Sequence, residues 1–385
     1  MILKYLEIIV REFLLCIIRA IVSPVFYFRR ENFKKTKIKG ILINVIKAPG
    51  LGNMILLSPL LNNLKRYFPN AEVFLLISSD RSKRYLDSLG FIEKVVVAPQ
   101  LKNCSVLEGI RFYKKIIIPL KIDFSIGTYL QTQYWFSIWN FFSGAKYRLG
   151  YYSKRKGVFD TFSVKAELNN HEVDNHLNAL RSLGVRELVE EPIFHVAEKD
   201  IQYAQNLLSS HYLGSRDKLV VMHPGAAGGW LGLKKWPVER FIDVAKRLHE
   251  EQICKVVFLC GPDDKVEANA IRSANQPYLL LFDSLDLGVL GAVISMCDVF
   301  LSNDNGPMHI AVALKRPIVG IFGPTLPQKN GPWLVKHKVI TANLPCQPCY
   351  DLINPITCNQ EVQFNCLLSV KVEDVYNTVC DFLRD

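Results

Sequence analysis

The fold of this chain is decided by residues 299–325, V-F-L-S-N-D-N-G-P-M-H-I-A-V-A-L-K-R-P-I-V-G-I-F-G-P-T. Two short apolar runs within it, residues 299–302 and 317–322, predict buried strands. Between these runs, apolar residues recur at helical spacing: Met308, Ile310, Ala311 and Leu314. A strand, a helix and a strand in this order predict a β-α-β unit, which is the building block of a parallel sheet.

Each predicted strand of this unit is followed by a polar turn. After the first strand, either Asp304 or Asn305 is suited to cap the helix, and Pro307 is suited to its first turn. The second strand is followed by Gly323-Pro324-Thr325. In a parallel sheet both turns lie at the carboxyl ends of the strands, where such folds bind ligands. A helix N-terminus at this edge offers free N–H groups and a positive dipole end, which favours a phosphate as the ligand.

Two series of strand, glycine-containing loop, helix and strand occur along the chain. The first has a strand at 38–45, a loop at 47–53, a helix at 54–67 and a strand at 71–77; the second has a strand at 219–222, a loop at 223–229, a helix at 237–250 and a strand at 255–259. They predict an α/β protein with two Rossmann-like domains facing across a cleft. We expect an N-terminal domain at 38–205 and a C-terminal domain at 206–385, preceded by a separate segment, 1–37.

Composition agrees with a globular protein that binds an anion. At 385 residues the chain is too long for one ordinary hydrophobic core. Its residues are 49% hydrophobic and 22% charged, which argues against a disordered protein. The formal net charge of +11 favours a nucleotide or a phospholipid surface as partner. The sequence has no zinc-finger spacing and no RNA-binding aromatic signature, so we expect no nucleic-acid partner.

The N-terminal segment 1–37 combines apolar residues with charges on one side. At roughly 100° per residue, the charges within residues 1–28 fall in an arc of about 140°; they are Lys4, Glu7, Arg11, Glu12 and Arg19. A basic cluster follows, made of Arg29, Arg30, Lys34, Lys35, Lys37 and Lys39. No uninterrupted apolar run approaches the roughly 20 residues that span a bilayer. We expect an amphipathic helix on the anionic cytoplasmic membrane surface; packing on the protein's own core, or a single unusual spanning helix, are the alternatives.

Cysteine usage points to a reducing compartment. Five of the ten cysteines lie singly in apolar runs, as core thiols do; they are Cys16, Cys104, Cys254, Cys260 and Cys297. Four others are clustered near the C-terminus, at Cys346, Cys349, Cys358 and Cys366. This cluster is compatible with structural zinc, with unligated thiols or with a disulfide, and its spacing is not that of a standard zinc ribbon.

Five segments of the chain carry a resemblance when taken together. They are Gly52-Asn-Met-Ile-Leu-Leu-Ser-Pro59 with Phe68-Pro69; residues 171–184; His223-Pro-Gly225; Lys234-Lys-Trp-Pro237; and Asp304-Asn-Gly-Pro-Met-His309 with Phe322-Gly-Pro-Thr325. This combination resembles glycosyltransferase family nine, the ADP-heptose:lipopolysaccharide heptosyltransferases of Gram-negative bacteria. The resemblance covers about residues 38–385, and its last segment is the most specific.

The resemblance implies a GT-B fold and an enzyme that transfers a sugar with inversion at the anomeric carbon. It implies a nucleotide-diphosphate sugar, ADP-heptose in the family, held mainly by the C-terminal domain. The acceptor, a lipopolysaccharide-type glycolipid, would be held mainly by the N-terminal domain. It also implies that no metal or other cofactor is needed, and the sequence contains no Asp-x-Asp metal site.

The resemblance assigns roles to residues at the predicted edge of the C-terminal sheet. Lys234 matches the family's phosphate-binding lysine, with a solvated lysine as the alternative. Asp304 matches an aspartate that contacts the donor sugar, with a helix cap as the alternative. Gly306 would let the chain approach the phosphates. The other expected donor contacts are His223, Gly225, Ala226, Asp264 (or Asp263), Asn305, His309, Gly323 and Thr325. For His309 a purely structural role is an equal alternative.

Asn53 departs from the family pattern. Heptosyltransferases of this type usually carry Asp after the glycine equivalent to Gly52, and that Asp is the candidate general base. A neutral amide cannot accept the proton at a useful pKa. Three explanations remain open: another group acts as base, the proton leaves late with Asn53 only orienting the hydroxyl, or transfer activity is lost.

We expect an active transferase that works as a peripheral protein on the cytoplasmic face of the inner membrane. Two alternatives remain open. One is a degenerate family member that binds nucleotide sugar or glycolipid without turnover, as Asn53 suggests. The other is a nucleotide-sugar epimerase, since GT-B folds include that enzyme class; the combination of Asn53, Lys234 and Asp304 argues for the transferase.

Overall fold

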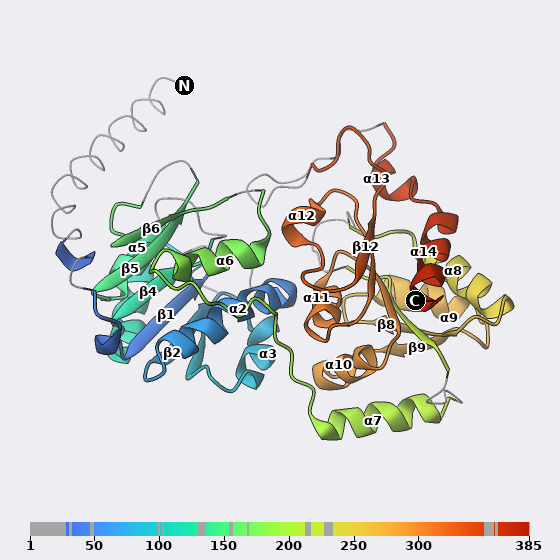
Figure 1. The fold of residues 1–385 in the computed structure, drawn as a ribbon, viewed down its shortest axis with the longest axis horizontal. Helices are drawn as coiled ribbons and strands as arrows, with labels where there is room; N and C mark the ends of the chain where they lie inside the picture. Colours follow the sequence, from blue (N-terminus) through green and yellow to red (C-terminus); the bar gives the residue numbers. More distant parts are fainter. Residues whose placement is uncertain are drawn as a thin grey trace. The chain divides into compact units, whose positions relative to one another are not determined.

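The chain folds into two compact α/β units in a computed structural model (Figure 1). The structure describes residues 28–30, 33–46, 50–98, 101, 104–129, 136–153, 157–167, 169–211, 217–226, 234–349, 358 and 361–384. Unit 1 comprises Met1–Gly50 and Leu57–Glu190, and unit 2 comprises Leu51–Leu56 and Glu191–Asp385. Most of the helix expected within 1–37 lies outside the described residues. Among those described, no helix is both long and apolar enough to cross a bilayer.

Unit 1 is built on a parallel sheet of six strands in the order β3-β2-β1-β4-β5-β6. Their bounds are β1 Gly40–Val45, β2 Glu72–Ile77, β3 Lys94–Val97, β4 Phe124–Gly127, β5 Tyr147–Tyr152 and β6 Phe162–Lys165. The chain winds outward from β1 to β3, then returns to place β4 on the other side of β1. A parallel sheet of this order has its topological switch point between β1 and β4.

Helices cover both faces of this sheet, as a Rossmann-like unit requires. They are α2 Leu51–Tyr67, α3 Lys83–Ser88, α4 Val106–Phe112, α5 Phe136–Phe142 and α6 Glu172–Arg181, with a π-helix, η4 Tyr113–Ile117, and short 3₁₀ turns η1 Lys35–Lys37, η2 Asp80–Ser82 and η5 Ile118–Leu120. On one face, Leu42, Phe74 and Val96 pack against Tyr113 and Ile117 of the π-helix. These contacts fix the segment from α4 to η5 on the sheet.

Unit 2 repeats the plan with the strand order β12-β11-β10-β7-β8-β9, again all parallel. The strands are β7 Leu219–His223, β8 Lys255–Cys260, β9 Leu280–Asp283, β10 Val299–Asn303, β11 Ile318–Ile321 and β12 His337–Ile340. The helices are α7 Glu198–Ser209, α8 Val238–Glu250, α9 Lys265–Ser273, α10 Leu287–Ser295, α11 Gly306–Ala313, α12 Pro327–Asn330, α13 Asn365–Leu368 and α14 Val372–Arg384. Its switch point lies between β7 and β10.

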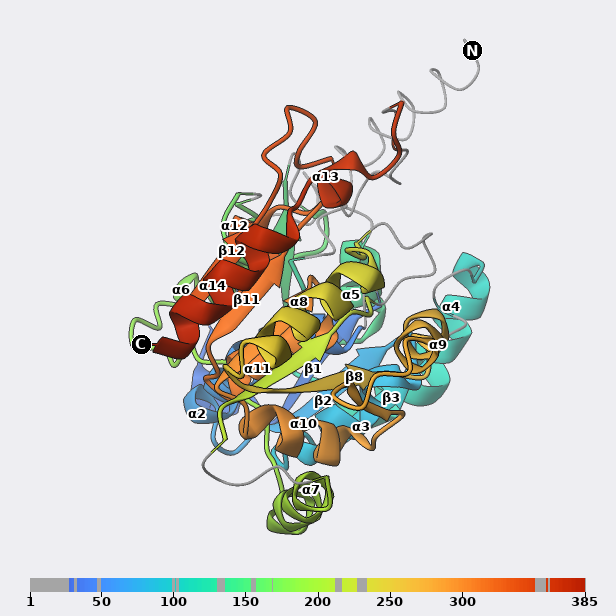
Figure 2. The same ribbon diagram turned by 90° about the vertical axis from the view of Figure 1, so that its right-hand side faces the viewer.

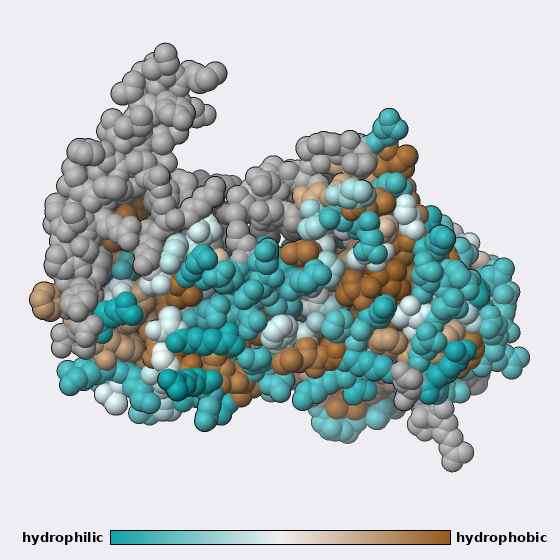
Figure 3. All heavy atoms as spheres, turned by 45° about the horizontal axis from the view of Figure 1, so that its top comes forward, coloured by the Kyte–Doolittle hydropathy of each residue, from teal (hydrophilic) through white to brown (hydrophobic). Residues whose placement is uncertain are grey.

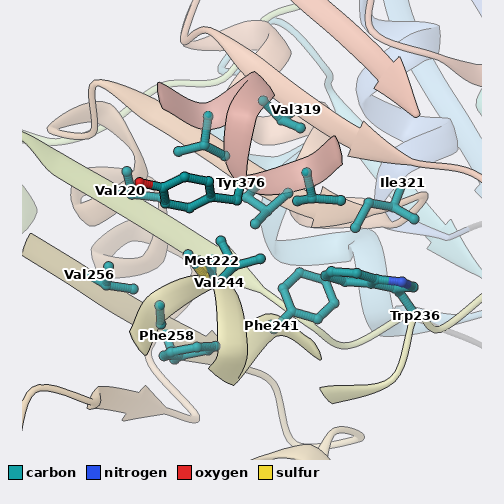
Figure 4. Packing of buried hydrophobic residues seen from close by; sticks show 14 of the residues in the cluster. Val220, Met222, Trp236, Phe241, Val244, Val256, Phe258, Val319, Ile321 and Tyr376 are labelled. Atoms are coloured by element: carbon teal, nitrogen blue, oxygen red, sulfur yellow. The ribbon is translucent and has the colours of Figure 1, made fainter. Parts of the chain in front are cut away.

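The core of unit 2 joins the sheet to α8 and α14 (Figure 4). Trp236, Phe241 and Tyr376 lie in this cluster, and the Trp236 ring packs edge-on against Phe241 at 5.0 Å between centroids. Trp236 Nε1 donates to the carbonyl oxygen of Val370 at 3.2 Å, so the large side chain is both buried and hydrogen-bonded. Burial of Trp236 anchors the polypeptide immediately after Lys234 and Lys235.

The surface is mixed in character. On the face drawn in Figure 3, hydrophilic side chains cover most of the described surface, and apolar side chains appear between them in separate groups.

The two α/β units and their doubly wound parallel sheets confirm the fold class predicted from the sequence. A cleft between the two domains stays a prediction.

Candidate active site

The candidate donor residues of unit 2 gather at the carboxyl ends of four neighbouring strands. His223 ends β7, and Asn303 ends β10, its neighbour at the switch point. Asp264 follows β8, and Gly323 and Thr325 follow β11. Loops that leave this edge in opposite directions create the usual ligand site of a doubly wound sheet. Residues 227–233 of the glycine-rich loop lie outside the described residues.

Lys234 and Asp304 form an ion pair at this edge. The distance from Lys234 Nζ to Asp304 Oδ2 is 2.7 Å. The Asp304 side chain is 6% exposed and that of Lys234 27% exposed, so the carboxylate is buried while the ammonium reaches solvent. Burial acts to raise the pKa of Asp304, but Lys234, helped by His309, outweighs it and holds the pKa below its ordinary value. Asp304 is therefore ionised at neutral pH, paired with the ammonium of Lys234.

Asp304 is not the helix cap, because Asn305 takes that role. The Asn305 side-chain oxygen accepts a hydrogen bond from the backbone N–H of Met308 at 2.9 Å, and Pro307 lies in the first turn of α11. One residue earlier, Asn303 accepts from Trp236 N at 3.0 Å and donates to Pro224 O at 2.6 Å. The side chains of Asn303 and Asn305 thus hydrogen-bond to other parts of the fold, and Asp304 is the residue of this turn that pairs with Lys234.

Asn303 is a functional support that the sequence analysis missed. Its amide joins the end of β10 to the turn after β7 and to the segment that carries Lys234. The signal available in the sequence was an asparagine at the end of an apolar strand, and its partners are 67 and 79 positions away. Such a long-range tie cannot be inferred from local spacing.

His223 lies in a buried polar cluster with Asn305 and Asp264. Asn305 Nδ2 is 2.7 Å from the carbonyl oxygen of Gly225 and 3.1 Å from His223 Nδ1, and His223 Nε2 is 3.6 Å from Asp264 Oδ2. These partners favour the tautomer with hydrogen on Nε2. Burial lowers the pKa of His223, and Asp264 only partly opposes this. His223 thus acts as a neutral spacer that holds the turn after β7 in place.

Gly225 and Lys235 both lie close to Asp264 in this part of the site. A Cβ atom on Gly225 would lie 2.1 Å from Asp264 Oδ1, so the position has no room for a side chain. Asp264 Oδ2 also accepts from Gly261 N at 2.8 Å. Lys235 Nζ is 2.8 Å from Glu267 Oε1 and 3.9 Å from Asp264 Oδ1. Lys235 is therefore paired with two acids, Glu267 and Asp264. Ala226, which follows Gly225, is buried as well.

The Gly323–Thr325 turn is supported from the C-terminal tail. Gln347 Nε2 donates to Gly323 O at 2.7 Å, and Cys349 N donates to Pro324 O at 3.0 Å. A Cβ atom on Gly323 would lie 2.7 Å from Leu367 Cγ, so the tail packs directly on this glycine. The Thr325 hydroxyl is close enough to Asp304 to lower its pKa slightly, yet it makes no hydrogen bond of normal length and angle with the described residues. A buried hydroxyl of this kind is available to a ligand oxygen.

Gly306 and His309 lie in the first turn and a half of α11. Gly306 is the first residue of the helix, and His309 is 5% exposed. The helix begins at the switch point, so the positive end of its dipole adds positive potential where Lys234 lies. His309 is near enough to Asp304 to affect its pKa, which places it in the same cluster.

Asn53 lies in the first turn of α2, one residue after Gly52, and its side chain is half-buried. Its placement relative to Lys234 and Asp304 stays a prediction.

The four tail cysteines are close enough that burial and their neighbours' thiolates raise the pKa of Cys366 to about 11. Over the part of the chain that the structure describes, no group of three or more His, Cys, Asp or Glu side chains could hold a metal ion.

Comparison with known proteins shows the family. The model of glycosyltransferase family 9 (heptosyltransferase) matches residues 121–358, which is more than half of the chain. Lipooligosaccharide heptosyltransferase 2 of Campylobacter jejuni is 24% identical over 344 residues, covering 87% of this chain and 96% of that protein.

Solved structures give the same result for the fold. A glycosyl transferase family 9 protein from Veillonella parvula aligns with a TM-score of 0.72 at 22% identity, covering 90% of this chain and 97% of that one. The Escherichia coli ADP-heptose lps heptosyltransferase II aligns with a TM-score of 0.67 at 19% identity, covering 90% and 99%. These likenesses confirm the GT-B class of the two-sheet fold. On the strength of the family match, this chain belongs to glycosyltransferase family 9, the heptosyltransferases.

Proposed function

We propose that the protein transfers a heptose from ADP-heptose to a lipopolysaccharide-type glycolipid, with inversion and without a metal ion. Membership of the family makes it a heptosyltransferase-like glycosyltransferase of lipopolysaccharide biosynthesis. The observation that carries the finer proposal is the Lys234–Asp304 pair at the carboxyl ends of β7 and β10. The structurally similar Escherichia coli protein is an ADP-heptose lps heptosyltransferase II, which motivates the choice of donor.

The donor diphosphate would bind beside Lys234. Its negative oxygens can accept from the ammonium and from the Thr325 hydroxyl, and the positive end of the α11 dipole favours their charge. Asp304 carries a negative charge of its own, so it is placed to accept hydrogen bonds from sugar hydroxyls and not to meet phosphate. The fixed 2.7 Å contact would keep Lys234 oriented before the donor arrives.

The reaction would be a single displacement. The acceptor oxygen forms a bond to the anomeric carbon while the bond from that carbon to the diphosphate oxygen breaks, and ADP leaves. Lys234 and the start of α11 would stabilise the negative charge that develops on the leaving diphosphate, as a metal does elsewhere. The hydroxyl proton must go to a base, and Asn53 cannot take it. Asn53 is proposed to orient the acceptor, with the proton leaving late or to another group.

The protein would act as a peripheral enzyme on the cytoplasmic face of the inner membrane, where a lipid-linked acceptor is exposed. The formal net charge of +11 supports contact with anionic lipid.

One alternative has a specific observation in its favour. Asn53 in place of an acid favours a member that binds nucleotide sugar or glycolipid without turnover. A single experiment separates the two: the purified chain is incubated with a panel of nucleotide sugars and truncated lipopolysaccharide acceptors, and the acceptor mass is measured. We expect a gain of one sugar residue that depends on the donor. Donor binding without any mass gain across the panel would support the degenerate protein instead, and conversion of the nucleotide sugar itself would indicate an epimerase.

A further inference from the structure

The segment from α4 to η5 in unit 1 is anchored firmly through its inner side. Tyr113 is fully buried, stacks on Trp139 with 5.6 Å between ring centroids, and donates to Asn44 Oδ1 at 3.2 Å. A Cβ atom on Gly109 would lie 2.1 Å from the Trp139 ring, so only glycine lets α4 approach α5 this closely. The outer side of the segment is thus held at a fixed orientation. α4 and β3 of this unit are both labelled in Figure 2.

The outer side carries large apolar side chains that are exposed in the described part of the chain. Leu107 is 68% exposed and Ile118 is 46% exposed. Arg111, Lys114 and Lys115, which lie between these two residues along the segment, are exposed as well and form one outer stripe with them. Phe141, at the end of α5, is 42% exposed, and its turn approaches the stripe, since a Cβ atom on Gly144 would be 3.7 Å from Ile118 Cγ1. We call Leu107, Arg111, Lys114, Lys115, Ile118 and Phe141 the basic apolar face.

The charge around this face is one-sided. Residues 104–121 contain four basic side chains, Arg111, Lys114, Lys115 and Lys121, and one acid, Glu108. Glu108 is engaged in a capping box with Ser105, accepting from its backbone N–H at 2.8 Å. Residues 136–142 carry no charge, and the next charged residue is Lys146. The exposed apolar side chains of this face are therefore surrounded mainly by basic side chains.

We propose that the basic apolar face docks on an anionic phospholipid surface. Leu107, Ile118 and Phe141 would enter the boundary between headgroups and acyl chains, while the lysines and arginine contact lipid phosphates. The proposal deepens the membrane association given under the proposed function and rests on it for the identity of the partner. It adds a second contact, within the folded unit, to the one expected for residues 1–37.

The residue types favour a lipid surface over a protein partner. The cores of protein interfaces are depleted in lysine, whereas here Lys114 and Lys115 lie between the apolar tips. Three separate apolar tips do not form the continuous groove that an amphipathic helix needs. Long basic side chains beside isolated apolar tips are instead the composition of interfacial membrane anchors.

The test is co-sedimentation of the full-length chain with vesicles of phosphatidylcholine alone or mixed with phosphatidylglycerol. Each lysine near an anionic surface contributes roughly a five-fold gain in affinity, so Lys114→Gln/Lys115→Gln should weaken binding to the anionic vesicles about 25-fold. Leu107→Ser/Ile118→Ser should weaken it about ten-fold, with less dependence on salt.

The matched controls remove the same charge or apolar surface elsewhere. Lys199→Gln/Lys338→Gln and Tyr203→Ser/Val266→Ser alter exposed residues of unit 2 and should bind vesicles as the wild type does. Wild-type binding by both face variants would overturn the proposal, and so would equal losses in the controls. A change of oligomeric state in the face variants, with vesicle binding unaltered, would also overturn it in favour of a contact between copies.

The same variants separate this proposal from the proposed function. Transfer to a water-soluble truncated acceptor needs no membrane, so the face variants should keep wild-type rates there. Loss of vesicle binding with retained transfer supports docking, whereas vesicle binding with no transfer by the wild type would remove the enzymatic proposal and leave the docking face standing. Circular dichroism of each variant checks that α4 remains folded.

Discussion

At the scale of single residues, Asp304 and Lys234 depend on each other. Asp304 is buried yet ionised chiefly because Lys234 lies 2.7 Å away, and Lys234 is oriented by that contact. The neighbours Asn303 and Asn305 are committed to other hydrogen bonds, so neither can replace the acid. One carboxylate thus carries the contact between the end of β10 and the lysine.

Asp304→Asn keeps the shape of the side chain and removes its charge. We expect kcat/KM to fall roughly 10- to 100-fold, because a charged hydrogen bond to Lys234 is lost together with an acceptor for donor hydroxyls. Steady-state transfer kinetics measure this. Asp243→Asn, on the exposed side of α8, is the matched control and should be neutral. A wild-type rate in Asp304→Asn would contradict the assigned role.

Two buried groups of unit 1 give opposite pH dependences of stability. Burial raises the pKa of Asp160 to about 7, with Arg148 opposing, so the folded protein keeps a proton that the unfolded chain loses above about pH 4. Stability from Asp160 therefore falls as pH rises from about 4 to about 7. Burial lowers the pKa of His176 to about 3, so its contribution is lost as pH falls below about 6.5.

The two effects partly cancel in the wild type and separate in single variants. Between about pH 5 and pH 7, Asp160→Asn should lose stability on acidification, and His176→Leu should gain it, by about 1 kcal/mol per pH unit in each case. Urea unfolding of the three proteins at both pH values measures the difference. Parallel changes with pH in all three would show that neither group titrates as stated.

At the scale of elements, periodicity predicted the strands and long helices of both sheets. The predicted strand at 71–77 is β2 apart from its first residue, and the helix at 237–250 is α8 apart from its first residue. The short strands β5, β6, β9 and β12 were missed, because four to six residues with mixed polarity carry no clear period. Helix α7 occupies the stretch expected to hold a domain boundary, and it packs through Asp200 against Gly288 of α10.

The turn after β11 depends on the tail that packs on it. Gly323→Ala places a methyl group 2.7 Å from Leu367 Cγ, which should shift the turn and weaken donor binding, with KM rising about ten-fold and kcat changing less. Leu367→Ala opens space for that methyl group, so the double variant should recover part of the loss. A double-mutant cycle in KM measures the coupling. Strictly additive effects would show that Leu367 does not support the turn.

At the scale of the whole molecule, the candidate site was predictable where the sequence has a local signature. Turns after apolar strands located His223, Asp304 and Thr325 at one edge, and the sheet order explains why that edge is shared. The support from Asn303, Gln347 and Leu367 was not predictable, since each acts on residues that only the fold brings near. The sequence also does not identify the proton acceptor, because Asn53 stands at the position where the family usually has an acidic residue.

The enzyme should need no added metal. In the proposed reaction, Lys234 and the start of α11 would stabilise the leaving diphosphate. Transfer rates measured after dialysis against a chelator should equal those before it. A loss that added Mg²⁺ restores would contradict this account.

Metal analysis of the same preparation tests for structural zinc at the four tail cysteines, which their clustering allows. Less than about a tenth of an equivalent of zinc would exclude it.

The central claim is that the edge formed by β7 and β10 holds the diphosphate of the donor through Lys234. Calorimetric titration of ADP into the wild-type protein and into Lys234→Gln tests it most directly, with Lys235→Gln as the control in which a cation already neutralised by Glu267 is removed. The account predicts that Lys234→Gln weakens ADP binding roughly 10- to 100-fold and that Lys235→Gln changes it much less. Equal affinity of the wild type and Lys234→Gln for ADP would contradict it.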